Sequence, residues 1–213
     1  MKKWYLGLLA SVVLLNACVT GTRNIAIDPP EYSNDKTASG SIYIGTIDDN
    51  RIFEAKPRDP STPSVKGDLA STPKEKLSTL IGRQRNGYGG AMGDVALLPG
   101  VTIQDRMRQL LTKGLQSRGY TVVSDPNAAK RVSVDISKFW GWFSPGMWAV
   151  SFEANLQCKI TFEENNQSRT LEVQGYGINK GQVASDANWE LTYQRAYQDF
   201  LQNLDTALDA AGL

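Results

Sequence analysis

VSVDISKFWGWFSPGMWAVSFEANLQCKITF, residues 132–162, is the stretch that decides the fold. On both sides of Ser144-Pro145-Gly146, apolar residues alternate with polar ones, which is the period of a β-strand with one buried face. The pattern predicts two long antiparallel strands joined by a tight loop. The residues expected on the buried faces are Val132, Val134, Ile136, Trp140 and Trp142 in the first strand, and Trp148, Val150, Phe152, Ala154, Leu156, Cys158, Ile160 and Phe162 in the second.

The register of this hairpin follows from its buried faces, because facing residues of an antiparallel pair lie on the same side of the sheet. A three-residue loop pairs Trp142 with Trp148 and Ile136 with Ala154, apolar with apolar. A two-residue turn would place apolar residues opposite polar ones. We therefore expect the three-residue loop, with Gly146 in the left-handed conformation.

Further strands are expected on both sides of the hairpin. SIYIGTI (41–47) alternates and predicts the first strand of the domain, and residues 120–123 and 169–178 predict two more. Gly175 and Gly177 indicate a bulge or a close approach of another element to the last strand.

Two helices are expected beside these strands. Thr102 is the expected N-cap of a helix that ends at Gly119, and a second helix begins near Ser185-Asp186. The order β-α-β-β-β-α predicts a two-layer α+β domain. We expect a mixed, mainly antiparallel sheet with both helices on one face.

A long insertion, residues 48–100, follows the first strand and far exceeds an ordinary connection. It contains KPRDPSTPS (56–64), in which Pro57, Pro60 and Pro63 exclude regular structure. The insertion is expected to project from the sheet and to offer a surface to a partner.

The second half of the insertion predicts a short helix and a loop. Thr72 is the expected cap, Glu75 would close a capping box, and the helix would end at Gly82. IGRQRNGYGGAMG (81–93) is too rich in glycine for a helix and predicts a flexible surface loop. Its end, GYGGAMG (87–93), lacks the glycine spacing of a dinucleotide fingerprint and the Gly-Lys-Ser/Thr of a phosphate loop.

MKKWYLGLLASVVLLNAC (1–18) has the layout of an export signal, with a charged start, an apolar run and small residues. The apolar run of about 12 residues is too short to span a bilayer. LNAC (15–18) resembles the lipobox of bacterial lipoproteins. This resemblance implies that residues 1–17 are removed as a signal peptide and that Cys18 carries lipid. An ordinary secretory signal before a chance cysteine is the alternative.

The lipidated tether is expected to cover residues 18–40 and to precede one domain, residues 41–213. As a flexible coil it would average roughly 25 Å between its ends, although Ile25 and Ile27 could form a short edge strand. Val19 follows the cysteine where related systems use aspartate for retention in the inner membrane. The resemblance therefore implies the outer membrane, with the domain facing the periplasm.

Composition excludes several classes of site. The chain has no histidine, which rules out a Ser-His-Asp or Cys-His nucleophile pair and histidine metal sites. Without Lys2 and Lys3, the 23 Lys+Arg and 22 Asp+Glu of the chain give a net charge of −1, so no nucleic-acid partner is expected. Once Cys18 is lipidated, only Cys158 remains, and we expect it to be a buried core residue.

Five residues are the candidates for docking a partner. Phe139, Phe143 and Met147 are expected on the outer face of the hairpin end, where they could contact a protein or lipid headgroups. Packing in the core is the alternative for these three. Arg83 and Arg85 could bind a phosphate or a carboxylate by bidentate contacts, or could be solvated charges.

A hydrolase would need two converging carboxylates. Adjacent acidic residues usually point in different directions, which disfavours this reading. The candidates are Asp48-Asp49, Asp94 and Glu163-Glu164.

The chain resembles the YajG-like family of small outer-membrane lipoproteins. The resemblance lies in the lipobox, in TIQDRMRQLLTKGLQSRGYTVV (102–123), in the hairpin and in the closing helix. It implies no catalytic residues, no metal and no cofactor. The larger insertion resembles a subgroup, some members of which are labelled flagellar biosynthesis proteins.

We therefore expect a non-enzymatic accessory or docking lipoprotein of the cell envelope. It would be held in the membrane by its lipid anchor, would contact an envelope protein, and could belong to an envelope machine such as the flagellum. The alternative is a lipid- or glycan-binding periplasmic module with an apolar pocket lined by Trp140 and Trp148.

Overall fold

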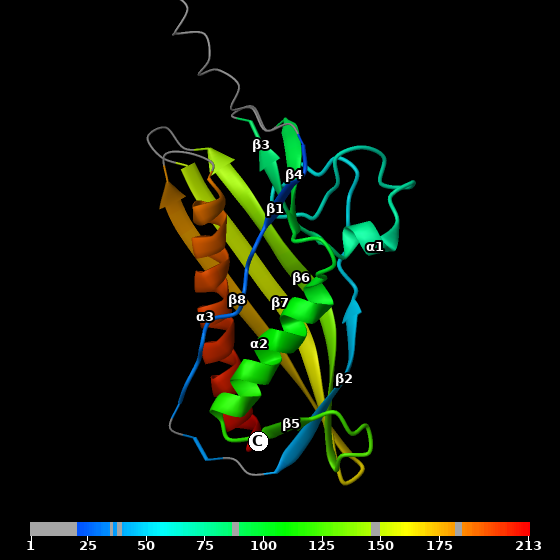
Figure 1. The fold of residues 1–213 in the computed structure, drawn as a ribbon, viewed down its shortest axis with the longest axis vertical. Helices are drawn as coiled ribbons and strands as arrows, with labels where there is room; N and C mark the ends of the chain where they lie inside the picture. Colours follow the sequence, from blue (N-terminus) through cyan, green and yellow to red (C-terminus); the bar gives the residue numbers. More distant parts are fainter. Residues whose placement is uncertain (1–20, 35, 38–39, 87–89, 146–149, 182–184) are drawn as a thin grey trace, which may run out of the picture.

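The described part of the chain forms an eight-stranded mixed sheet with two long helices across one face (Figure 1). The computed structural model describes residues 21–34, 36–37, 40–86, 90–145, 150–181 and 185–213. The predicted two-layer α+β class is confirmed, and the longest ladders of the sheet are antiparallel. Among the described residues, no helix is long and apolar enough to cross a membrane.

The three longest strands of the sheet are β6 (Lys130–Pro145), β7 (Val150–Glu164) and β8 (Gln167–Gly181), and β8 lies at one edge. The two strands expected within residues 132–162 are present and antiparallel. Gly146 and Trp148 join them and lie outside the described residues.

The register of this hairpin differs from the predicted one. Ile136 pairs with Cys158 instead of Ala154, and Trp142 pairs with Glu153. The predicted three-residue loop is therefore wrong. The prediction assumed an unbroken alternation along the first strand, and the structure breaks that alternation.

A β-bulge at Ser137 interrupts the ladder, because the register shifts between Ile136 and Lys138. One extra residue in a strand turns every later side chain to the opposite face of the sheet. Phe139 consequently points toward the helices, whereas Trp140 and Trp142 point away from them. The bulge also keeps Lys138 out of the helix-covered core, into which an unbroken alternation would have directed it.

The first strand, helix and second strand follow the prediction. β2 (Ser41–Asp49) pairs in parallel with β5 (Thr121–Val123), and α2 (Ile103–Ser117) connects them through the insertion. Thr102 caps α2 by a capping box with its third residue, and Gly119 has a φ of +97° beyond the helix end. The apolar residues of α2 are buried in the core: Ile103, Met107, Leu110, Leu111 and Leu115.

The closing helix, α3 (Asp186–Ala211), begins after its N-cap Ser185 and crosses β8 at very short range. A Cβ added to Gly177 would lie 2.1 Å from the carbonyl oxygen of Thr192, and Gly175 is similarly close to α3. Only glycine permits this approach of two backbones. The close approach predicted for these two glycines is confirmed.

Polar side chains of α3 bond to the outer backbone edge of β8. Asp199 accepts a hydrogen bond from the amide of Tyr176 at 2.9 Å, and Asn203 donates one to the carbonyl of Gln174 at 2.9 Å. These bonds occupy backbone groups that an edge strand would otherwise expose.

The insertion is more regular than predicted. It contains α1 (Lys74–Leu77), β3 (Leu80–Arg85) and β4 (Ala91–Leu97). The helix ends five residues before the predicted Gly82, and its N-cap is Pro73, which makes no side-chain capping bond. The flexible loop expected over residues 81–93 is wrong for 81–85 and 91–93, which lie in an antiparallel pair.

Glycine at position 82 serves close packing rather than flexibility. β3 pairs in parallel with the C-terminal half of β6, at Gly141 and Trp142. A Cβ on Gly82 would lie 2.7 Å from the carbonyl oxygen of Gly141. The glycine content that predicted a loop thus allows β3 to lie against β6.

The insertion covers a second hydrophobic cluster on the outer face of the sheet. Trp140 and Trp142 pack there with Val65 and Leu80, and the indole nitrogen of Trp140 donates to the carbonyl of Pro60 at 3.2 Å. The proline-rich stretch is therefore fixed by aromatic packing.

The chain before β2 is also packed against the domain. β1 (Arg23–Ile25) pairs in parallel with β4, and Ile25 and Ile27 are buried in the main core. Lys36 pairs with Asp209 at 2.6 Å. The short edge strand considered for Ile25 and Ile27 is present as β1. The flexible coil predicted for the tether is therefore wrong for residues 23–27 and at Lys36, which pack against the domain.

Candidate functional site

The candidate site is a groove between the β3–β4 hairpin and the loop at residues 55–67. The side chains of Arg83 and Arg85 lie on the same face of β3, since alternate strand residues share a face. Arg83 faces Asp94 across the β3–β4 ladder, and the two form an ion pair at 3.4 Å with almost no exposed surface. We call this space, of about 390 Å³, the arginine groove. Its lining residues are Ala55, Lys56, Pro57, Ser64, Val65, Gly67, Arg83, Arg85 and Ala91.

The loop wall of the arginine groove is held by backbone contacts. The amide of Lys66 donates to the carboxylate of Asp94 at 2.9 Å, and the amide of Glu54 donates to the carbonyl of Pro63 at 2.9 Å. Arg85 donates to the carbonyl of Pro57 at 3.4 Å. Asp94 therefore connects both walls, because it contacts Arg83 on one side and the loop on the other.

Two buried polar groups at the groove have unused hydrogen-bonding capacity. Within the described residues, the Oγ of Ser64 and the Nε of Arg83 have no hydrogen-bond partner. Ser64 is 1% exposed and Arg83 is 6% exposed. Buried donors usually have partners, and both of these belong to residues that line the groove.

The electrostatics of the groove favour an anion. The pKa of Arg83 is lowered from its ordinary value. Burial is the largest cause, the charge of Asp94 acts in the opposite direction, and the charge of Arg85 lowers the pKa further. Arginine nevertheless stays protonated in proteins. Lys56, Arg83 and Arg85 thus place three positive charges around one buried carboxylate, that of Asp94.

The structure places the predicted docking residues differently from the sequence reading. Arg83 and Arg85 are brought together in the arginine groove. Phe139 is fully buried against α3 and is not a surface residue, because the bulge turned it inward. Phe143 is partly buried and meets Phe152 edge to face at 5.5 Å. Met147 lies outside the described residues.

Lys56 and Ser64 were missed by sequence reasoning. Both lie in the stretch KPRDPSTPS, which was noted only for its prolines. The three prolines that exclude regular structure also make a stiff loop able to hold polar groups against β3. The three prolines were therefore the feature of the sequence from which a fixed, ligand-facing loop could have been predicted.

The apolar pocket considered for a lipid or glycan is not formed by the tryptophans described. Trp140 is fully buried beneath the proline-rich loop and meets Phe53 edge to face at 5.8 Å. Trp142 is 9% exposed. Trp148 lies outside the described residues.

The candidate carboxylates are dispersed. Asp94 contacts Arg83, and Asp49 pairs with Arg51 at 2.8 Å. Arg51 is buried, and its guanidinium also donates to the carbonyl of Leu80 at 2.6 Å. In the residues that the structure describes, no group of three acidic or cysteine side chains is placed to hold a metal ion.

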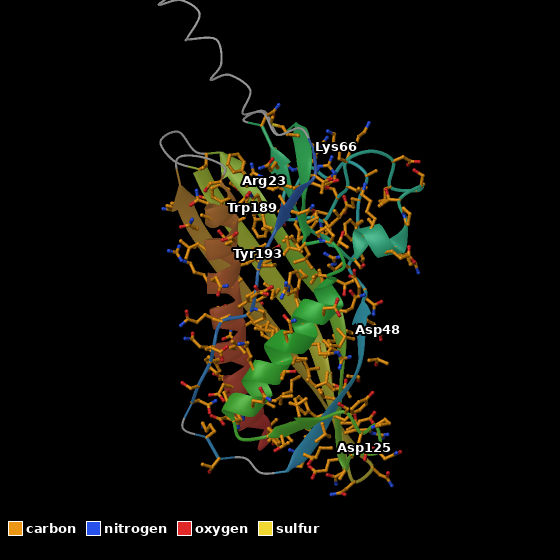
Figure 2. The ribbon with its side chains drawn as sticks, viewed as in Figure 1. Arg23, Asp48, Lys66, Asp125, Trp189 and Tyr193 are labelled. Atoms are coloured by element: carbon orange, nitrogen blue, oxygen red, sulfur yellow. The ribbon has the colours of Figure 1, made fainter. Side chains whose placement is uncertain are left out.

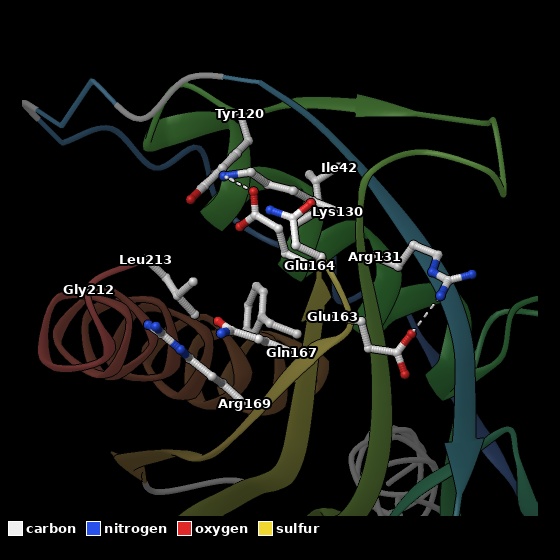
Figure 3. Close-up of a pocket in the computed structure, with 12 residues that line it drawn as sticks. Ile42, Tyr120, Lys130, Arg131, Glu163, Glu164, Gln167, Arg169, Gly212 and Leu213 are labelled. Carbon is white, nitrogen blue, oxygen red and sulfur yellow. Dashed lines mark hydrogen bonds and ion pairs between the residues drawn. The ribbon is translucent and has the colours of Figure 1, made fainter.

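A second hollow lies at the opposite end of the domain, beside the C-terminal residues (Figure 3). Its volume is about 130 Å³. Lys130 pairs with Glu164 at 3.5 Å, and Arg131 pairs with Glu163 at 3.0 Å. Arg169 also lines this hollow, and it donates to the carbonyl of Ala211. Two of its three cations, Lys130 and Arg131, are thus paired with carboxylates.

Comparison with known proteins gives a family. A family described as an uncharacterized lipoprotein matches residues 85–206, which is more than half of the chain. No curated protein sequence matches the chain.

Two solved structures are distantly similar. Protein XCC0632 from Xanthomonas campestris, of the DUF330 family, has 11% identity and a TM-score of 0.45, with 90% of this chain and 95% of that chain covered. Hypothetical protein CT253 from Chlamydia trachomatis has 10% identity and a TM-score of 0.41, with 81% and 99% covered. The family match confirms the YajG-like resemblance, and the chain belongs to this lipoprotein family.

Proposed function

We propose that this chain is a non-enzymatic accessory lipoprotein of the cell envelope that binds an anionic group in the arginine groove. The lipid on Cys18 would hold it at the periplasmic face of the outer membrane. Membership of a lipoprotein family and the sequence LNAC support the anchor. Val19 supports the outer membrane, since aspartate would be the inner-membrane signal at that position.

The observation that carries the proposal is the pair of buried donors at the groove. Ser64 Oγ and Arg83 Nε have no hydrogen-bond partner in the described part of the chain, and both belong to residues under 10% exposed. A carboxylate or phosphate oxygen would accept from them and would be attracted by Arg85 and Lys56. Charge-assisted bonds of this kind are about twice as strong as neutral ones.

The non-enzymatic character rests on the distribution of reactive groups. The chain has no histidine, and its acidic candidates Asp49, Asp94 and Glu163 each contact an arginine. The thiol of Cys158 is buried in the core. Binding of an anion in the arginine groove requires no reacting group.

An envelope protein partner and a link to the flagellum stay predictions. Of the five residues expected to meet a partner, Phe139 and Phe143 pack against the main core and Met147 lies outside the described residues. Arg83 and Arg85 remain, and both line the groove. A partner would therefore have to present a carboxylate or phosphate to the groove.

The proposal is tested by titrating inorganic phosphate, and separately acetate, into the full-length protein in detergent. We expect saturable shifts in the ¹H–¹⁵N spectrum at the amides of Val65, Gly67 and Ala91. Arg85→Glu should abolish them, because it reverses a charge in the groove. Lys180→Glu, at an exposed position on β8, makes the same charge change elsewhere and should leave them intact. Linear shifts spread over the surface, unaffected by Arg85→Glu, would contradict groove binding.

A further inference from the structure

The start of the described chain is fixed firmly to the domain. Arg23 pairs with Asp186 at 3.1 Å, and Gln194 donates to the carbonyl of Asp28 at 2.7 Å. The hydroxyl of Tyr197 donates to the carbonyl of Ile27 at 3.4 Å. A lipid anchor on Cys18 would therefore pull on a rigid point and not on a long coil.

The distance from that point to the anchor is short. Four residues separate Cys18 from Arg23. Even a fully extended chain covers at most about 3.6 Å per residue, so Arg23 lies within about 18 Å of the lipidated cysteine. The domain consequently has little freedom to move away from the membrane surface.

The arginine groove belongs to the same part of the fold as Arg23. Arg23 is in register with Val95 of β4, and Val95 is in register with Gly82 of β3. Neighbouring strands are about 4.8 Å apart, which puts Gly82 roughly 10 Å from Arg23. Arg83 and Arg85 follow directly on β3.

The direction of β1 strengthens this relationship. Because β1 and β4 are parallel, the chain that enters β1 approaches from the side of Ala91, which is paired with Arg85. The β3–β4 hairpin lies at one end of the long axis of the domain (Figure 1). Arg23 and Lys66 lie toward that end, and Asp125 lies at the other (Figure 2).

We propose that the arginine groove binds the phosphate of a phospholipid headgroup from the leaflet that holds the anchor. The inference rests on the proposed function, and it names the anion. It also assigns an orientation: the β3–β4 hairpin faces the membrane, and the turn near Asp125 faces the periplasm.

The chemistry of a phosphodiester suits the groove. Its single negative charge and its two free oxygens match the guanidinium of Arg85 and the two buried donors, Arg83 Nε and Ser64 Oγ. Lys56 is exposed at the rim, where it can reach a neighbouring headgroup. Asp59 is an acid near the groove: hydrogen bonds from Ser61 lower its pKa most, and the charges of Lys138 and then Arg85 lower it further. The cations still outnumber the acids around the groove.

Hydrogen exchange of the full-length lipoprotein tests the inference. The protein is compared in phosphatidylglycerol nanodiscs and in detergent micelles without phosphate. We expect amides at residues 64–67 and 83–85 to exchange about tenfold more slowly in nanodiscs. Amides near Asp125 should exchange at the same rate in both, because that end lies away from the membrane.

Variants identify the groove as the cause. Arg85→Glu should remove the protection while the protein still enters the nanodisc through its lipid. Ser64→Ala, which removes one donor and little volume, should reduce the protection. Lys180→Glu should retain it. Full protection in Arg85→Glu, or equal protection at residues 64–67 and near Asp125, would overturn the inference.

A second arm separates the two sources of phosphate. Inorganic phosphate is added to the detergent sample without nanodiscs. Protection of the groove by inorganic phosphate, together with none in nanodiscs, would mean a free anion and would overturn the inference. Failure of the protein to enter nanodiscs at all would instead refute the anchor and thus the proposed function. Entry without groove protection would refute only the headgroup assignment.

Discussion

The ring of Phe139 stacks on the ring of Tyr193, with 5.7 Å between the centroids and 23° between the planes. Phe139 is fully buried. Phe139→Ala should lower the free energy of unfolding by about 3–5 kcal/mol, because it leaves a cavity between β6 and α3. Urea unfolding measures this loss. Phe143→Ala is the matched control and should cost less, since Phe143 is only partly buried; wild-type stability in Phe139→Ala would refute the inward position.

The bulge at Ser137 can be tested by deletion. Removing Ser137 takes out the one extra residue, so Phe139 should still face the helices and Trp140 should still face away from them. We expect the deletion variant to keep cooperative unfolding, as followed by near-ultraviolet circular dichroism. Ser137→Ala keeps the bulge at an exposed position and should retain the wild-type transition within about 0.5 kcal/mol. Loss of cooperative unfolding in the deletion variant is the contrary outcome.

Gly177 should not tolerate a side chain. The Cβ of alanine would meet the carbonyl oxygen of Thr192 at 2.1 Å, so α3 would have to move away from β8. We expect a loss of about 3 kcal/mol or more in thermal unfolding, at the upper end of overpacking effects. Gly45→Ala, also in a strand, meets its nearest atom at 3.4 Å and should change stability much less.

Cys158 should be unreactive in the folded protein. Burial raises the pKa of its thiol from 9.0 to about 12, so the reactive thiolate is scarce at neutral pH. Because the folded pKa is raised, the contribution to stability is complete below 9.0 and is lost as the pH rises toward about 12. A thiol reagent should modify the protein only after denaturation. The mature lipoprotein should then yield one thiol, and two would mean that Cys18 carries no lipid.

Asp209 should make the attachment of the N-terminal segment sensitive to acid. Hydrogen bonds from Lys36 and then Arg118 lower the pKa of Asp209 below its ordinary 3.8. The carboxylate therefore adds stability above that value, and this contribution disappears as the pH falls through the lowered pKa. Unfolding curves of the wild type and Asp209→Asn should differ at neutral pH and converge in acid. A constant difference across this range would contradict the assignment.

The regular elements were predictable because local patterns determined them. Thr102 caps its helix as predicted, and the last helix begins at Asp186, where its start was predicted. Ile42 and Ile44 point inward from the first strand. The hairpin register was not predictable from alternation alone. An unbroken alternation would have placed the charged Lys138 on the buried face, and this was the sign in the sequence that the strand is irregular. The bulge at Ser137 removes the conflict.

The candidate site could be predicted only in part. Arg83 and Arg85 share a face only if residues 81–85 form a strand. The glycines of residues 81–93 predicted a loop there instead. Arg51 shows the same limit: its guanidinium donates to the carbonyls of Leu80 and Phe139, which are 29 and 88 positions away in sequence. Contacts of that range depend on the completed fold.

The parallel pairing of β1 with β4 has a mechanical consequence. A load applied along the axis of β1 strains all its bonds to β4 together, in shear, instead of opening them one after another. The ion pair of Arg23 with Asp186 adds a second attachment, to α3. The segment next to the anchor therefore acts as a bracket that spreads tension over the sheet and a long helix.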